Sequence, residues 1–280
     1  MRKILIPVDF SGCSNNAVSY AAELSKQIDV SSIILMKSVY VSIYSTILPT
    51  VDLVQVSAEY IDEQQQKAEQ QLELLKQELI RQTGPSVTVT AIISDDPVLR
   101  AVHHLIEAEQ VTLVIVGNEN DECRTDESYI VDEIIGISKT SPVPVLVVPG
   151  NYPFRKIEKA VLPCDFKALS RLNALETLSA AIGKFEGELL VLNVDPKQKH
   201  LQERAAKEKE LAEALSSYDY QLHYSEEKNI IDGITHFAKQ QDAQLVIALP
   251  GRHSFFYSLT HRSITEALAE NGLQPVLILK

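Results

Sequence analysis

Short apolar runs alternate with longer amphipathic segments along the whole chain. This alternation is typical of βαβ units built around a parallel sheet that is buried on both faces. We therefore predict an α/β fold with the same number of strands in each half of the chain. The predicted strands lie near residues 3–8, 33–39, 87–93, 112–116 and 145–148, and near residues 159–163, 188–194, 220–225, 245–249 and 276–279.

Between these runs, apolar residues recur at the spacing of one helix face. Such stripes predict helices over residues 17–28, over a long Gln/Glu-rich segment near 57–81, and over residues 98–106 and 230–238. A further stripe predicts the first helix of the second half, and it consists of Leu172, Leu175, Leu178 and Ile182. We interpret all of these stripes as core and not as binding sites.

The chain contains an internal repeat. The segment Lys3–Phe10 is echoed by Lys159–Phe166, and residues 111–116 and 144–148 are echoed in the same order by 243–248 and 275–279. The order is preserved, so we predict two tandem doubly wound domains, each with a five-stranded parallel sheet. The predicted domains are 1–150 and 156–280, and the Pro- and Gly-containing segment 149–154 is the predicted linker.

Composition and charge exclude several classes of protein. The net charge of −12 argues against a partner that is duplex nucleic acid, which requires neutralisation of phosphates. The charge is uneven, since residues 1–150 hold 10 Lys or Arg against 21 Asp or Glu, whereas the remainder holds 16 against 17. No apolar run approaches the ~18 residues of a spanning helix, and no signal peptide is seen, so we expect no membrane partner. The three cysteines form no CxxC pair and fit reduced thiols in a cytoplasmic protein.

Two motifs accompany this order of strands. The first strand of each half ends in Pro-x-Asp, at 7–9 and 163–165, and the last strand of the first half lies in the segment Ser-Pro-Val-Pro-Val-Leu-Val-Val at 141–148. Together they resemble the universal stress protein family over essentially the full chain. The resemblance implies an adenine nucleotide α-hydrolase-like fold and a role in stress response. It also implies that the fifth strands of the two halves pair, which makes the chain a pseudo-dimer of its own halves and protects two exposed edges. A homodimer of the whole chain remains open.

ATP-binding members of that family carry a Gly-x2-Gly-x9-Gly-Ser/Thr loop after strand four, whose amides hold phosphates. In the first half Gly117 matches the opening glycine, but Val131 and Asp132 stand near the position of the closing Gly-Ser. Between residues 117 and 133, seven carboxylates face one arginine. A triphosphate would meet like charge there, so the first loop is predicted to disfavour ATP.

The corresponding second-half loop retains only the serine of that motif, Ser263. Leu249, Arg252 and Arg262 stand at the three glycine positions. The loop from 251 to 263 contains no acid, and its basic residues could attract an anion through side chains instead of amides. These basic residues are Arg252, His253, His261 and Arg262.

The resemblance also assigns residues at the nucleoside end of each pocket. Asp9 and Asp165 match the family's strand-one aspartate, and Val39 and Val194 fall near the strand-two end that contacts adenine. Simple capping of the following helix is an equal alternative for the aspartates. The candidate binding residues are therefore Asp9, Val39, Gly117, Asp165, Val194, Arg252, His253, Arg262 and Ser263.

Three classes of function remain after these observations. The favoured one is a non-enzymatic stress protein that senses a small ligand or binds an unknown protein partner, with degenerate nucleotide loops and no required cofactor. The second is a stress protein with ATP or another adenine nucleotide, or a different anionic small molecule, in one half. The third is an enzyme of the nucleotide α-hydrolase-like group, for which residues 10–14 give only a faint echo of a phosphate loop. The histidines lack the spacing of a zinc site.

Overall fold

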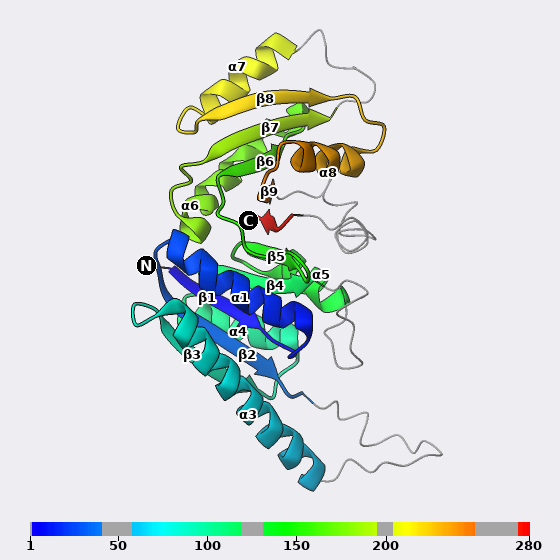
Figure 1. The fold of residues 1–280 in the computed structure, drawn as a ribbon. Coiled ribbons are helices and arrows are strands. Elements are labelled where there is room, and N and C mark those ends of the chain that lie inside the picture. The colour runs from blue at the N-terminus through cyan, green and yellow to red at the C-terminus, as the bar shows by residue number, and fades with distance from the viewer. Residues whose placement is uncertain (1, 41–57, 119–130, 195–203, 250–273) are drawn as a thin grey trace, which may run out of the picture.

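The described residues of the chain form one ten-stranded sheet with helices on both faces (Figure 1). A computed structural model describes residues 2–40, 58–118, 131–194, 204–249 and 274–280. The strand order is β3-β2-β1-β4-β5-β10-β9-β6-β7-β8, so the second half repeats the order of the first in mirror sequence across the β5–β10 junction.

The first half contributes five strands and four described helices. Its strands are β1 (Arg2–Pro7), β2 (Val30–Ser38), β3 (Thr88–Ser94), β4 (Leu113–Asn118) and β5 (Val145–Pro149). Its helices are α1 (Gly12–Gln27), α3 (Ala58–Thr83), α4 (Val98–Glu109) and α5 (Val131–Thr140). Every strand pair within this half is parallel, as the sequence pattern predicts.

The second half follows the same plan with shorter elements. Its strands are β6 (Lys159–Pro163), β7 (Glu188–Val194), β8 (Tyr220–Ser225), β9 (Leu245–Ala248) and β10 (Val276–Ile278). Its helices are η1 (Phe166–Leu175, a 3-10 helix), α6 (Glu176–Ile182), α7 (Arg204–Ala214) and α8 (Ile230–Gln240). These strand pairs are also parallel, so the predicted α/β fold with five parallel strands in each half is confirmed, and the two sets of strands join in one sheet.

The two halves join through their fifth strands. β5 and β10 run antiparallel, with Leu146 opposite Leu277 and Val147 opposite Val276. This confirms the predicted pairing of fifth strands. Both strands are buried at this junction, so neither offers an unpaired edge to another chain.

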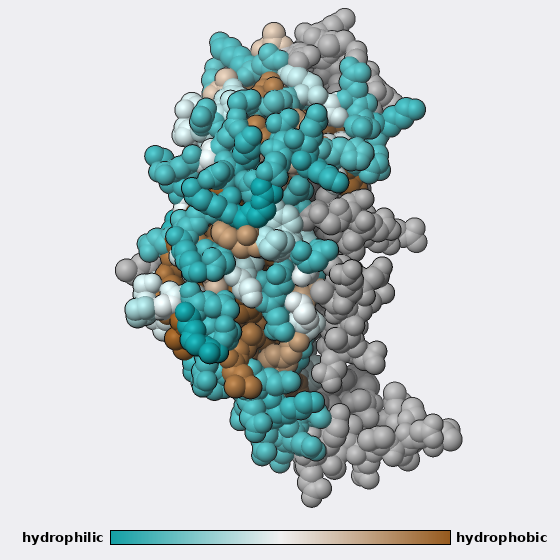
Figure 2. All heavy atoms as spheres, in the orientation of Figure 1, coloured by the Kyte–Doolittle hydropathy of each residue, from teal (hydrophilic) through white to brown (hydrophobic). Residues whose placement is uncertain are grey.

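The sheet separates two apolar cores because side chains alternate between its faces. Ile4 and Ile6 of β1 pack in the core beneath α1, α3, η1, α6 and α7, whereas Leu5 packs in the core beneath α4, α5 and α8. All three are fully buried, which explains why the strands appear in the sequence as continuous apolar runs. The helices turn their polar faces outward, and the face drawn in Figure 2 is mostly hydrophilic.

One predicted helix is wrong in its form. The stripe from Leu172 to Ile182 was expected to make a continuous α-helix, but the chain first forms the 3-10 helix η1 and becomes α-helical only at Glu176. The apolar residues of the stripe are nevertheless buried in the core, as predicted. None of the helices within the described ranges has the length and hydropathy needed to cross a bilayer.

Candidate ligand pocket of the first half

The turn between β1 and α1 is fixed by polar contacts of its own residues. Asp9 is only 6% exposed, and its Oδ1 accepts a hydrogen bond from the Ser11 backbone N–H at 2.9 Å. Ser11 is the N-cap of α1, and its hydroxyl oxygen accepts from the Ser14 N–H at 3.2 Å. Phe10, between them, has a left-handed φ of 67°. The helix cap is thus Ser11 and not Asp9, which corrects the capping alternative for this aspartate.

Gly117 allows the first turn of α1 to lie directly on β4. A Cβ atom at Gly117 would lie 2.3 Å from the carbonyl oxygen of Cys13 and 2.9 Å from the Ser14 nitrogen. Real Cβ atoms do not approach backbone this closely, so a side chain here would push the helix away. The glycine that resembles a phosphate-loop residue therefore has a packing role of its own.

A pocket opens where β1, β4, α1 and α5 meet, at the carboxyl ends of the strands. Ligands of open α/β sheets bind at this edge, next to the point where the strand order reverses. Asp9 follows β1 on the α5 side of the sheet, because β1 alternates and Leu5 already faces that core. The lining residues are Pro7, Asp9, Ser11, Cys13, Ser14, Val116, Gly117, Glu133, Ile134 and Ile137.

The pocket holds two carboxyl groups that influence each other. The pKa of Glu133 lies above its usual value, first because burial removes water from the carboxylate and second because the negative charge of Asp9 is near. Lys37 acts in the opposite direction and lowers this pKa. The Lys37 ammonium also lies over the Phe10 ring, 5.2 Å from its centroid, at the end of β2.

Sequence reasoning missed Glu133 and Lys37 as site residues. Glu133 is one of seven carboxylates between residues 117 and 133, and no motif separates it from its neighbours. Lys37 occupies the carboxyl end of a strand beside β1, so the rule that ligands bind at this edge could have singled it out. The effects of Asp9 and Lys37 on Glu133 depend on distances between elements that are far apart in sequence.

The structure brings some predicted site residues together and not others. Asp9 and Gly117 line the same pocket, as the resemblance implies. Val39 follows β2, where its N–H donates to the Ser94 carbonyl at 2.9 Å, and it is not among the lining residues. The predicted loop residues Arg252, His253, Arg262 and Ser263 lie outside the described residues, and the anion site they suggest stays a prediction.

The second half differs at the matching positions. Asp165 is exposed, unlike Asp9, and Val194 is half-buried, with its Cγ1 close to Gly233. Leu249 stands where Gly117 does and is buried in the same core as Phe166 and Leu169 of η1. A leucine at this position leaves no room for the approach that α1 makes to Gly117. The first helical segment of the second half is the 3-10 helix η1 and not an α-helix like α1.

The surroundings of His103 and Cys164 are those of residues with a structural role. His103 of α4 contacts the Thr140 hydroxyl of α5 through Nε2 at 2.8 Å, which ties these two helices together. Within the described ranges, no group of three or more His, Cys, Asp or Glu side chains could hold a metal ion. Cys164 is buried, and burial raises the pKa of its thiol to about 12, a value at which the reactive thiolate is scarce.

Comparisons with known proteins agree with this architecture. The sequence profile of the universal stress protein family matches residues 1–149. A universal stress protein from Archaeoglobus fulgidus DSM 4304 has a similar structure, with a TM-score of 0.69 and 16% identity over 99% of this chain and 96% of that one. A putative universal stress protein from Pseudomonas aeruginosa UCBPP-PA14 gives 0.60 and 17%, over 100% and 93%. At these identities the structures show a shared fold. No curated protein matches the sequence.

Proposed function

The chain belongs to the universal stress protein family, and from this premise we propose that it is a non-catalytic stress-response regulator that senses a small ligand in its first half. We further propose that this ligand is uncharged or cationic and is not a nucleoside triphosphate. The observation that carries the proposal is the pair of carboxyl groups, Asp9 and Glu133, that line one pocket.

The electrostatics of the pocket support this choice of ligand. The carboxylates of buried Asp9 and half-buried Glu133 repel phosphate oxygens, and in a site with little water the repulsion is stronger than at the surface. The raised pKa of Glu133 shows that its negative charge is already disfavoured before any ligand enters. A ligand that carries further negative charge would add to that cost, whereas a hydroxyl or ammonium group could donate hydrogen bonds to these carboxyl groups.

The presence of Gly117 does not oppose the proposal. In ATP-binding relatives the opening glycine of the loop serves the phosphates, but here the close contact with Cys13 already requires a glycine. Its occurrence is therefore explained by packing alone. The two halves differ at this position, because in the second half Leu249 stands where the first half has Gly117.

We also propose that residues 1–150 and 156–280 are the two repeated domains of the chain, joined through one sheet and a shared core. The mirrored strand order and the antiparallel β5–β10 junction support this division. The basic second loop remains a proposed anion site of the second domain, and an unidentified protein partner, a homodimer and a cytosolic location stay predictions.

Calorimetric titration of the full chain with adenosine and with ATP tests the proposed ligand class. We expect ATP to bind more weakly than adenosine. The difference between the two affinities should be smaller in the Glu133→Gln and Asp9→Asn variants, because each variant removes a negative charge. The matched control is Glu213→Gln on the exposed face of α7, which should leave both affinities unchanged. Micromolar ATP binding by wild type that is lost in Asp9→Ala would contradict the proposal.

A further inference from the structure

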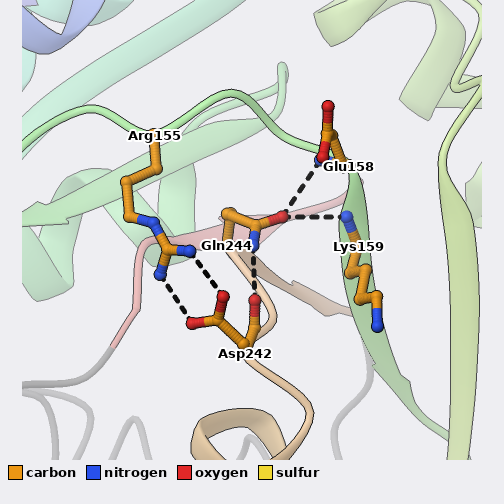
Figure 3. A network of polar contacts seen from close by, with 5 residues as sticks. All are labelled: Arg155, Glu158, Lys159, Asp242 and Gln244. Carbon is orange, nitrogen blue, oxygen red and sulfur yellow. Dashed lines mark hydrogen bonds and ion pairs between the residues drawn. The ribbon is translucent and has the colours of Figure 1, made fainter.

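The segment that joins the two halves, residues 149–159, is packed against both of them. We call it the linker. It follows β5 and ends at the start of β6. Its polar contacts with the second half are drawn in Figure 3. Its contacts with the first half involve helix α1 and, through the Gly150 N–H, the Asn118 carbonyl of β4.

Helix α1 holds the linker at three points along its length. Near its start, Asn16 Nδ2 donates to the carbonyl oxygens of Pro149 and Tyr152, at 2.9 and 3.0 Å. Near its end, the Gln27 amide exchanges two hydrogen bonds with the backbone of Ile157, at 2.8 and 2.9 Å. Between them, the Tyr20 and Phe154 rings pack edge to face, with centroids 5.0 Å apart.

The second half holds the same linker through two residues of the α8–β9 turn. The Arg155 guanidinium donates two hydrogen bonds to Asp242, at 2.7 and 2.6 Å, in the fork geometry that favours carboxylates. Gln244 is only 6% exposed, and its Oε1 accepts from the backbone N–H groups of Glu158 and Lys159 at 3.0 and 2.9 Å. In Figure 3 the Arg155 guanidinium lies beside the Asp242 carboxylate, and the Gln244 side chain points toward Glu158 and Lys159.

The start of α1 is also a wall of the pocket. Ser11, Cys13 and Ser14 line it, and Cys13 touches Gly117. Asn16 lies one helical turn after Cys13, so its two bonds to the linker act on the same turn of helix that closes the pocket. The chain of contacts is therefore continuous from Asp242, through Arg155 and the linker backbone, to Asn16 and the pocket wall.

We propose that the linker is a coupling element: its attachment to Asp242 and Gln244 of the second half holds the first turn of α1 against β4 and so limits opening of the first-half pocket. A partner or ligand that moves the α8–β9 turn would then change access to the pocket. Coupling between sites is reciprocal, so occupancy of the pocket would also change the attachment of the linker to the second half. This coupling goes beyond the proposed ligand and does not depend on its identity.

The test uses the Cys13 thiol as a reporter of pocket opening. Cys13 is 1% exposed, so a small thiol reagent reaches it only when the first turn of α1 moves. The full-length protein is labelled under native conditions, and the modified peptides are quantified by mass spectrometry. Arg155→Ala, which lies outside the pocket lining, is expected to raise the Cys13 labelling rate about two- to five-fold, the range for loss of one exposed bidentate ion pair.

Two comparisons make the result specific. Arg81→Ala removes an exposed ion pair of α3 with Glu78, far from the linker, and should leave the Cys13 rate unchanged. Cys164, buried in the second half, reports global opening in the same samples. An unchanged Cys13 rate in Arg155→Ala, or an equal rise at Cys13 and Cys164, would overturn the proposal.

A double variant tests whether the effect passes through the linker. Asn16→Ala alone should raise the Cys13 rate, because it removes the linker's hold on the first turns of α1. If Arg155 acts through the same attachment, the Asn16→Ala/Arg155→Ala protein should label more slowly than the product of the two single effects predicts. Independent, multiplicative effects would instead show that Arg155 does not act through Asn16, and the proposal would fail.

Discussion

The backbone of Cys13 lies where a side chain at Gly117 would begin, since a Cβ there would come within 2.3 Å of the Cys13 carbonyl oxygen. The obstacle is main chain, which cannot rotate away as a side chain can. We therefore expect Gly117→Ala to displace the first turn of α1 and to lower the free energy of unfolding by about 1–3 kcal/mol, the usual cost of overpacking. Denaturant unfolding followed by circular dichroism measures this loss.

Gly136 provides the matched control for that substitution. The three atoms nearest to a Cβ at Gly136 would all belong to the Leu99 side chain, the first at 2.9 Å, and this side chain can move. Alanine also favours the helix interior over glycine by ~1 kcal/mol, which offsets part of the crowding. Gly136→Ala should therefore cost much less than Gly117→Ala, and equal losses would argue against the role we assign to Gly117.

The raised pKa of Glu133 predicts that removing its charge changes the stability of the protein by an amount that depends on pH. The folded state binds this proton more tightly than the unfolded state, so the wild type loses stability as pH rises from the ordinary glutamate value of 4.5 through the higher folded value. Glu133→Gln removes that loss. The variant should be more stable than wild type at neutral pH, by less than ~1 kcal/mol because the group is partly exposed. The difference should vanish below pH 4.5, and thermal unfolding across this range would show it.

Lys280 predicts the opposite dependence on pH. Its Nζ donates to the Ser138 carbonyl at the end of α5, 2.6 Å away, and burial lowers its pKa to about 8. Between pH 8 and the ordinary lysine value of 10.5 the unfolded state binds more protons, so stability rises with pH in this window. Between pH 8 and 10.5, the free energy of unfolding of the wild type should rise by about 1 kcal/mol or more relative to that of Lys280→Met. Each unit of difference in pKa corresponds to 1.36 kcal/mol. Parallel pH profiles for the two proteins would contradict the assignment.

The apolar pattern predicts most of the fold because the sheet is buried on both faces. Strand β7, for example, was expected at 188–194 and occupies Glu188–Val194. The internal repeat predicts the five-stranded plan of each half, and burial of the fifth-strand edges predicts their pairing. The 3-10 form of η1 could not be predicted, because the apolar stripe from Leu172 to Ile182 has the spacing of an α-helix face.

The candidate site could be predicted only in part. Asp9 and Gly117 were found because each belongs to a short motif that a single stretch of sequence displays. Glu133 and Lys37 belong to no motif, and they join the site through the arrangement of α5 and β2 around β1. The contacts of Asn16 and Gln27 with the linker are equally invisible in the sequence, since polar residues on a helix usually face water.

The antiparallel junction of the halves gives the last prediction. Leu277 of β10 is fully buried, lies opposite Leu146 of β5 and packs in the core that both halves share on the α1 side of the sheet. Leu277→Ala should lower the free energy of unfolding by about 2–5 kcal/mol and should speed hydrogen exchange of the amides in β5 and in β9 alike, because β10 pairs with both. Ile278 is the matched control, since it is the next residue of the same strand, faces the other side and is only half-buried. Ile278→Ala should cost less and leave exchange in β5 closer to that of wild type. If the two variants lose the same stability, or if exchange in Leu277→Ala rises in β9 but not in β5, the halves do not depend on this junction for a shared core.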